Sequence, residues 1–168
     1  MKTLSTPVAT ASVILGASLL VATPASAEER ICRGTIGAVT LDNVKVPSGA
    51  TCTLKGTRVK GNIVVNSKAT LRANGAVVNG NIQSEGHRLV VVNNTRVGGS
   101  IQLKQGGGLT VSANKVEGDV QIFSNKSGTK TIRNNRIDGN LQCKSNTPAP
   151  IGSGNVVDGN KEDQCRRL

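Results

Sequence analysis

The sequence predicts an all-β protein, a single right-handed parallel β-helix (solenoid) of about six or seven coils. Three observations support this fold class. A six-residue phrase recurs, with the sequences VNGNIQ at 78–83, VGGSIQ at 97–102, VEGDVQ at 116–121 and IDGNLQ at 137–142. Within each repeat, apolar residues and glycines alternate with polar residues, which is the period of a half-buried strand. The one aromatic residue is Phe123, so the interior must be filled with short β-branched and leucine side chains, which favour strands.

The glycines of this phrase give the length of one coil. They recur at intervals of 19 to 21 residues, at Gly61, Gly80, Gly99, Gly118, Gly139 and Gly159. Repetition at this period is typical of a solenoid, in which each repeat buries its apolar side against its neighbours. Because crossovers between parallel strands are nearly always right-handed, we expect a right-handed helix.

Residues 1–27 have the pattern of a secretory signal peptide. A basic start at Lys2 is followed by apolar segments and by the cleavage signal Ala25-Ser26-Ala27. We expect cleavage after Ala27 and a secreted or extracytoplasmic protein. Residues 28–168 then form one β-solenoid domain, with an N-terminal cap and first coil at 28–56, regular coils at 57–143 and a C-terminal cap at 144–168. No segment of this domain approaches the ~20 apolar residues of a membrane span.

Stacked coils place equivalent residues above one another, about 4.8 Å apart. The predicted inward columns are Val59, Val78, Val97, Val116, Ile137 and Val157, and Ile63, Ile82, Ile101, Val120 and Leu141. A second apolar element precedes each phrase, at Leu54, Leu71, Leu89 with Val91, Leu109 with Val111, and Ile132. The predicted outward ladders, whose amides can hydrogen-bond from coil to coil, are Gln83, Gln102, Gln121 and Gln142, and Asn62, Asn81, Ser100, Asp119, Asn140 and Asn160. The final repeat places Lys161 and Asp163 in inward columns, as expected of a terminating coil.

The four cysteines are expected to form disulfides that clamp both ends of the stack. An even number of cysteines in an exported chain indicates disulfides, with three possible pairings. Cys32 and Cys52 are 20 residues apart and Cys143 and Cys165 are 22 apart, so each pair falls on adjacent coils, at a separation that a disulfide can bridge. We therefore expect Cys32–Cys52 and Cys143–Cys165. A four-cysteine zinc site is the alternative, but no two cysteines have the close spacing typical of such sites.

The chain is strongly basic. Removing Lys2 with the leader leaves 20 of the 21 Lys and Arg residues and all 10 Asp and Glu residues, a formal net charge of +10. A column of basic residues stands immediately before the phrase, at Arg58, Arg96, Lys115 and Arg136. A second cluster surrounds a following corner, at Lys68, Arg88, Lys104, Lys126 and Lys144. Two basic ridges along a rigid rod could follow the charges of a polyanion, although the same residues could simply keep a solenoid surface polar.

An anionic polysaccharide or wall polymer is the expected partner. Sequence-specific nucleic-acid binding is disfavoured because the chain has no aromatic platform on which bases could stack. The leading hypothesis is therefore a non-enzymatic, exported binding or scaffold protein of the cell envelope or the extracellular space, with a basic face for anionic polymers.

An acidic group provides the alternative. Glu117, Asp119 and Asp138 should point outward on neighbouring coils, where crowded carboxylates could recruit calcium. A small calcium-assisted polysaccharide lyase or hydrolase would use them with a basic residue, although plain ion pairs also explain them. His87, the only histidine, has no second histidine and no nucleophile motif to work with. We therefore assign no catalytic residue and no cofactor.

The C-terminal segment resembles the ending of a group of small exported bacterial proteins. The residues that carry this resemblance are 139–144 (GNLQCK), 148–150 (PAP) and 159–165 (GNKEDQC). More distantly, the coil length and the G-N-I-x-V pattern are similar to those of bactofilins, short β-helices that polymerise end to end. That resemblance implies a self-assembling structural protein, whereas the signal peptide and the clamped ends favour a monomer. Neither resemblance supplies catalytic residues.

Overall fold

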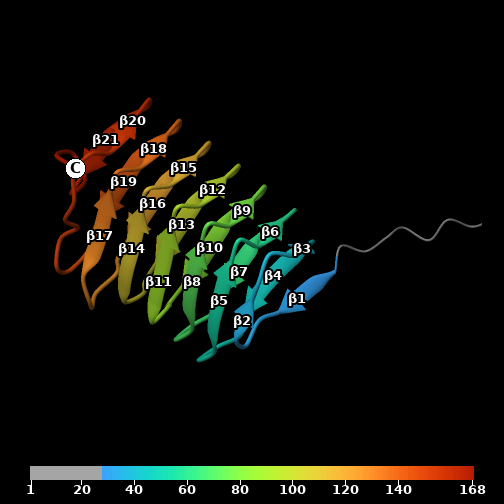
Figure 1. Ribbon diagram of the computed structural model, residues 1–168. Helices are drawn as coiled ribbons and strands as arrows, with labels where there is room; N and C mark the ends of the chain where they lie inside the picture. Colours follow the sequence, from blue (N-terminus) through green and yellow to red (C-terminus); the bar gives the residue numbers. More distant parts are fainter. Residues whose placement is uncertain (1–27) are drawn as a thin grey trace, which may run out of the picture.

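The computed structural model describes residues 28–168, which form a β-solenoid of about seven coils without any helix (Figure 1). The strands lie in three sheets, and all strand pairing is parallel, so the predicted fold class is confirmed. The predicted signal peptide lies outside the described residues. Within residues 28–168, no helix is long and apolar enough to cross a membrane.

Each complete coil supplies one short strand to each of three sheets, which we name A, B and C in chain order. Sheet A has eight strands: β1 (Glu29–Ile31), β4 (Asn43–Val46), β7 (Ile63–Val65), β10 (Ile82–Glu85), β13 (Ile101–Lys104), β16 (Val120–Phe123), β19 (Leu141–Lys144) and β21 (Lys161–Asp163). Sheet B has six: β2 (Thr35–Ile36), β5 (Thr51–Lys55), β8 (Thr70–Asn74), β11 (Leu89–Asn93), β14 (Gly108–Ser112) and β17 (Lys130–Arg133). Sheet C has seven: β3 (Thr40–Leu41), β6 (Arg58–Val59), β9 (Val77–Val78), β12 (Arg96–Val97), β15 (Lys115–Val116), β18 (Arg136–Ile137) and β20 (Val156–Val157).

Strands of neighbouring coils pair so that equivalent residues of the sequence repeat lie side by side. Ile82 pairs with Ile63 on one side and Ile101 on the other, and Val97 pairs with Val78 in the same way. The predicted inward columns are therefore columns in space. Their members are buried, except for Val157 in the last coil, which is half-buried. The interior is aliphatic, because Phe123 lies on the outer side of sheet A.

In the second apolar element, Leu89 and Val91 do not face the interior. In β11, Val90 and Val92 are buried, whereas Leu89 and Val91 face outward and are half-exposed. Residues 89–92 are all apolar, so alternation alone could not decide which side faces inward. Stacking decides it, because Val90 pairs with the buried Leu71 of the preceding coil.

The recurring phrase is explained by close stacking. A Cβ atom on Gly80 would lie 2.6 Å from the carbonyl oxygen of Gly61, so only glycine allows the coils to approach here. Beside this column, Oδ1 of Asn62 accepts hydrogen bonds from the backbone N–H (2.8 Å) and the side-chain amide (3.2 Å) of Asn81. The pattern repeats in later coils, so the phrase encodes the architecture.

Disulfides close both ends of the stack, as predicted. The Cα atoms are 5.5 Å apart in Cys32–Cys52 and 5.2 Å apart in Cys143–Cys165. These bonds are compatible with an extracytoplasmic location. In the last coil, Lys161 pairs with Leu141 and its Nζ donates a 2.8 Å hydrogen bond to a backbone carbonyl, which ends the inward apolar column.

Candidate anion-binding surface

The predicted basic column lies on the outer side of sheet C. Arg96, Lys115 and Arg136 are direct neighbours on β12, β15 and β18. Arg58 is separated from them by Val77 of β9, which pairs with both Arg58 and Arg96. The four basic side chains are exposed. The sequence therefore predicted their alignment correctly, although it did not show how their charges are balanced.

Carboxylates in the adjacent column neutralise much of this charge. Nη2 of Arg96 lies 2.8 Å from Oε1 of Glu117. Nη2 of Arg136 lies 2.9 Å from Oδ2 of Asp158, and its Nε lies 3.6 Å from Oδ1 of Asp138. The outer side of sheet C therefore alternates in sign and is not a continuous positive ridge.

Two of the four basic residues on this face have no such partner. No carboxylate of residues 28–168 lies within 4.0 Å of the ammonium of Lys115 or of the guanidinium of Arg58. A shallow hollow of about 560 Å³ separates Arg58 from Arg96, over the short side chain of Val77 and the backbone of Gly98. Gly98 cannot be replaced without disturbance, because a Cβ atom there would lie 2.6 Å from the carbonyl oxygen of Asn79.

The second basic cluster lies at the turns that join sheet A to sheet B, which we call the A–B corner. Lys68 is the corner residue of its coil and adopts a left-handed conformation with φ 59°. Lys104 and Lys144 end their strands on sheet A, and Lys126 follows β16. Arg88 bends onto sheet B, where Nε donates to the hydroxyl of Thr70 (3.0 Å) and Nη2 to that of Thr51 (3.2 Å). Arg88 therefore lies between the basic residues of the corner and those of sheet B.

Sheet B carries basic residues and no acidic ones. Its six strands contain no Asp or Glu, and the same holds for the turns that lead from them to sheet C. The exposed basic residues beside or on this sheet are Arg33, Lys55, Arg72, Arg88 and Arg133. We call these five residues, together with the corner residues Lys68, Lys104, Lys126 and Lys144, the basic face. None of them forms an ion pair with another residue of the described chain.

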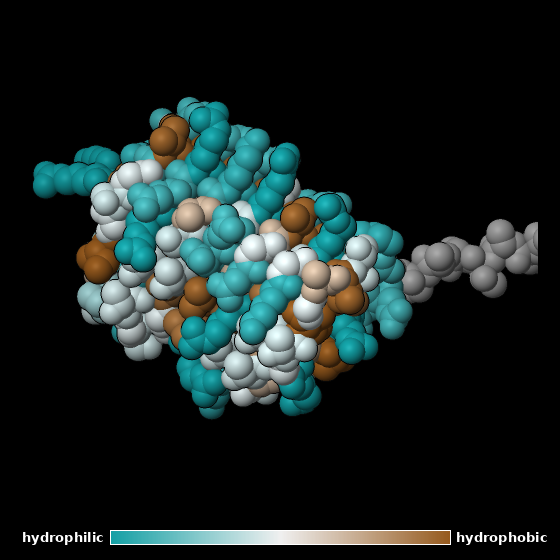
Figure 2. All heavy atoms as spheres, viewed as in Figure 1, coloured by the Kyte–Doolittle hydropathy of each residue, from teal (hydrophilic) through white to brown (hydrophobic). Residues whose placement is uncertain are grey.

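The remaining surface is polar with small apolar patches. Figure 2 shows one side of the solenoid, on which hydrophilic side chains run in rows across the coils and apolar side chains appear in separate spots. The exposed large apolar residues belong to the first and last coils: Ile31, Val39, Ile151 and Val156. The middle of the solenoid thus offers polar and charged contacts.

The predicted acidic group does not gather into one site. Glu117 and Asp138 are engaged by Arg96 and Arg136. Oδ1 of Asp119 accepts hydrogen bonds from the backbone N–H (2.7 Å) and the side-chain amide (3.2 Å) of Asn140. In the described part of the chain, no three acidic, histidine or cysteine side chains lie close enough together to hold a metal ion.

His87 is buried at the A–B corner, only 2 % exposed. Its ring lies over Gly106 of the next coil, where any Cβ atom would collide with it. Neither ring nitrogen has a hydrogen-bond partner within residues 28–168. Burial, and secondly the charge of Lys130, lower the pKa of His87 to about 4. The side chain is therefore neutral at pH 7.

Lys130 is a buried charge that sequence reasoning missed. It pairs with Leu109 and so occupies an inward column of sheet B. Its Nζ donates to the backbone carbonyls of Ser127 (3.1 Å), Gly128 (2.9 Å) and Thr147 (2.6 Å). Burial, and secondly the charge of Lys126, lower the pKa of Lys130. The alternation Lys130-Thr131-Ile132, in phase with Leu109-Thr110-Val111, is the signal that could have revealed it.

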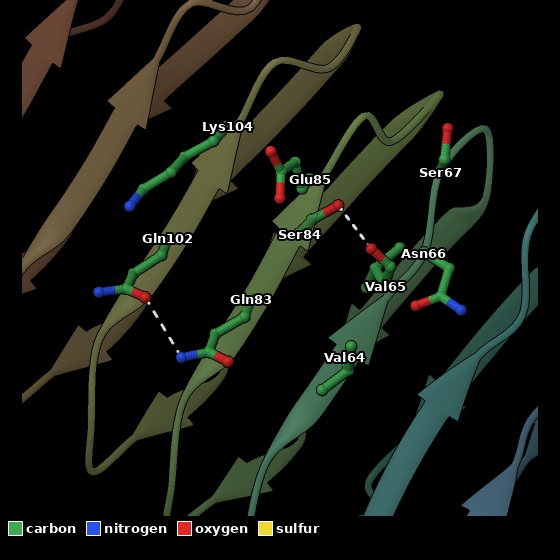
Figure 3. Close-up of a pocket in the computed structure, with 9 residues that line it drawn as sticks. All are labelled: Val64, Val65, Asn66, Ser67, Gln83, Ser84, Glu85, Gln102 and Lys104. Atoms are coloured by element: carbon green, nitrogen blue, oxygen red, sulfur yellow. Dashed lines mark hydrogen bonds between the residues drawn. The ribbon is translucent and has the colours of Figure 1, made fainter.

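A second hollow, of about 400 Å³, opens on the outer side of sheet A (Figure 3). It lies where β7 carries Val64 while the next four coils carry glutamines of the outward ladder. Gln83, Glu85 and Lys104 are among its lining residues. Lys104 also belongs to the basic face, so the two features adjoin.

Comparisons with protein-family models, with curated proteins and with solved structures give no match.

Proposed function

We propose that the protein is an exported, non-enzymatic binding or scaffold protein that holds anionic polymers on its basic face, at the cell envelope or outside the cell. The observation that carries this proposal is the segregation of charge. On sheet C, Arg96 and Arg136 are paired with carboxylates, whereas none of the nine residues of the basic face has a carboxylate partner. Unpaired cations along a rigid surface attract a polyanion in a salt-dependent way.

Export is part of the proposal. Two disulfides are typical of proteins from oxidising compartments, and the sequence of residues 1–27 has the pattern of a signal peptide cleaved after Ala27. The paired state of Glu117, Asp119 and Asp138 favours binding over the alternative of a calcium-assisted lyase or hydrolase, because these carboxylates already have partners.

The test compares two variants with equal loss of charge. In the first, Lys55, Lys68, Arg72 and Arg88 of the basic face are changed to glutamine. In the second, Arg58, Arg96, Lys115 and Arg136 of sheet C are changed to glutamine. Each variant loses four positive charges, so any difference between them reports the location of binding and not the net charge.

Retention on immobilised polygalacturonate and on heparin is measured along a salt gradient, using residues 28–168 with both disulfides formed. We expect the basic-face variant to bind on the order of tenfold more weakly at low salt, because four exposed ion pairs of about 0.2–1 kcal/mol each sum to roughly 1–4 kcal/mol. The sheet C variant should elute close to the unmodified protein. Equal loss in the two variants, or no retention of the unmodified protein, would refute the proposal.

A further inference from the structure

The hollow on sheet A arises because β7 has a valine, Val64, in the column where the next coils have glutamines. Nε2 of Gln83 donates to Oε1 of Gln102 (3.2 Å), Gln102 donates in the same way to Gln121 (3.2 Å), and the chain continues through Gln142 to the carboxylate of Glu162. At the other end, β7 has Val64 in this column, and its short side chain leaves the hollow above it (Figure 3).

The ladder gives the hollow an oriented acceptor. Because every amide donates toward the C-terminal coil, Oε1 of Gln83 faces the opposite way, toward Val64 (Figure 3). No donor among residues 28–168 reaches this oxygen. Gln102 and the rest of the ladder hold the Gln83 amide in place, so the acceptor is fixed before any ligand arrives, which lowers the entropic cost of binding.

Two charged groups adjoin this acceptor. Glu85 and Lys104 are paired neighbours on β10 and β13, yet they do not form an ion pair with each other or with another described residue. The ammonium of Lys104 lies 5.8 Å from the centre of the Phe123 ring, which attracts it weakly. The hollow therefore presents an apolar floor, a neutral acceptor, a carboxylate and an ammonium.

We propose that this hollow binds one uronic-acid unit of an acidic polysaccharide, an inference that rests on the proposed function and names its ligand class. The C–H face of a pyranose ring can lie on Val64, and its hydroxyls can donate to Oε1 of Gln83 and to Glu85. Its carboxylate can pair with Lys104, from which the rest of the polymer continues onto the basic face. The volume of about 400 Å³ lies within the range of small-ligand sites.

The same groups disfavour a polyphosphate or nucleic-acid backbone. An ionised phosphodiester has no donor for Oε1 of Gln83, and it would be repelled by Glu85. The hollow thus distinguishes between polymers that the basic face alone would treat alike.

Val64→Gln tests this inference without altering any charge. The new amide would extend the ladder by donating to Oε1 of Gln83 and would fill the hollow. Val64→Thr is the matched control, because threonine has a similar volume and leaves the hollow open. Thermal unfolding of both variants checks that the solenoid remains folded, and calorimetric titration with trigalacturonate and with tripolyphosphate gives the affinities.

We expect the unmodified protein and Val64→Thr to bind trigalacturonate more tightly than tripolyphosphate. In Val64→Gln the affinity for trigalacturonate should fall at least about tenfold, as expected when an oriented hydrogen bond and the ring contact are lost together, while tripolyphosphate binding is unchanged. Equal trigalacturonate affinity in Val64→Gln and Val64→Thr would refute the uronate site. It would not affect the proposal that the basic face binds polyanions. If Val64→Gln does not fold, Glu85→Gln is the test variant. We expect it to reduce the ratio of trigalacturonate affinity to tripolyphosphate affinity. An unchanged affinity ratio would refute the uronate site.

Discussion

Protonation of His87 should weaken the solenoid as the pH falls. The imidazole is buried, has no hydrogen-bond partner within residues 28–168, and its pKa is lowered to about 4 by burial and by Lys130. In the unfolded chain the same group titrates near its ordinary value of 6.5. Above pH 6.5 both states are neutral and the group contributes nothing to the pH dependence.

Between pH 6.5 and pH 4 the unfolded state binds a proton that the folded state does not, so stability declines as pH is lowered. Below pH 4 both states are protonated and the loss levels off. A difference of about 2.5 pKa units corresponds to about 3 kcal/mol of unfolding free energy by pH 4. Lys130 is the described group whose charge acts on the imidazole.

His87→Asn provides the comparison, because asparagine occupies the equivalent corner position in later coils, at Asn125 and Asn146. Urea unfolding of both proteins from pH 7.5 to pH 3.5, with disulfides intact, gives the free energies. Carboxylates common to both chains cancel in the difference. Between pH 7 and pH 4 the stability of the unmodified protein should fall by about 3 kcal/mol relative to the variant.

The same titration can be followed directly, because His87 is the only histidine and its ring protons give unambiguous NMR signals. A midpoint near 6.5 in the folded protein, or a stability difference that does not vary with pH, would refute the reasoning from burial.

Two further changes test the interior and the C-terminal clamp. Lys130→Met removes the ammonium that three backbone carbonyls share and leaves them without this donor. We expect the free energy of unfolding, measured with urea at pH 7, to fall by about 1–3 kcal/mol. An unchanged unfolding midpoint would show that these hydrogen bonds make no net contribution to stability. Replacing Cys143 and Cys165 together by serine opens a loop of 22 residues and should lower the free energy of unfolding by about 3 kcal/mol. The rate of amide hydrogen exchange should then rise first in β19–β21. A uniform rise in exchange along the stack would contradict an end clamp.

Most of the fold could be predicted because the repeat converts sequence spacing into spatial contact. The columns of Ile63 and Val59, the glycine column and both disulfides follow from residues 19 to 22 apart. The orientation of β11 could not be predicted, because residues 89–92 are apolar at every position. Only the buried neighbours in the adjacent coils determine which side faces inward.

The sequence predicts that the basic residues of the candidate site align, but it does not predict which of them form ion pairs. Equivalent positions placed Arg96, Lys115 and Arg136 in one column, but an ion pair depends on side-chain reach into the neighbouring column. Glu117 belongs to the coil after Arg96, 21 residues away, so its role is visible only when two columns are compared together. The hollow over Val64 was hidden for the same reason, since it is defined by the side chains around it.

The contrast between sheets B and C bears on whether the charges serve folding or binding. On sheet C, Arg96, Lys115 and Arg136 stack directly, about 4.8 Å apart, and like charges at this distance destabilise a sheet. The carboxylates beside them are therefore accounted for by stability alone.

Sheet B needs no such compensation. Lys55 and Arg133 share a column but are separated by Asn74, Asn93 and Ser112, and Arg72 is flanked by Thr53 and Val91. With no stacked cations, a few acidic residues on this sheet would have been as acceptable to folding as the basic ones, yet the sheet has none. Because stability does not require an exclusively positive sheet B, its sign supports the proposed binding of an external polyanion.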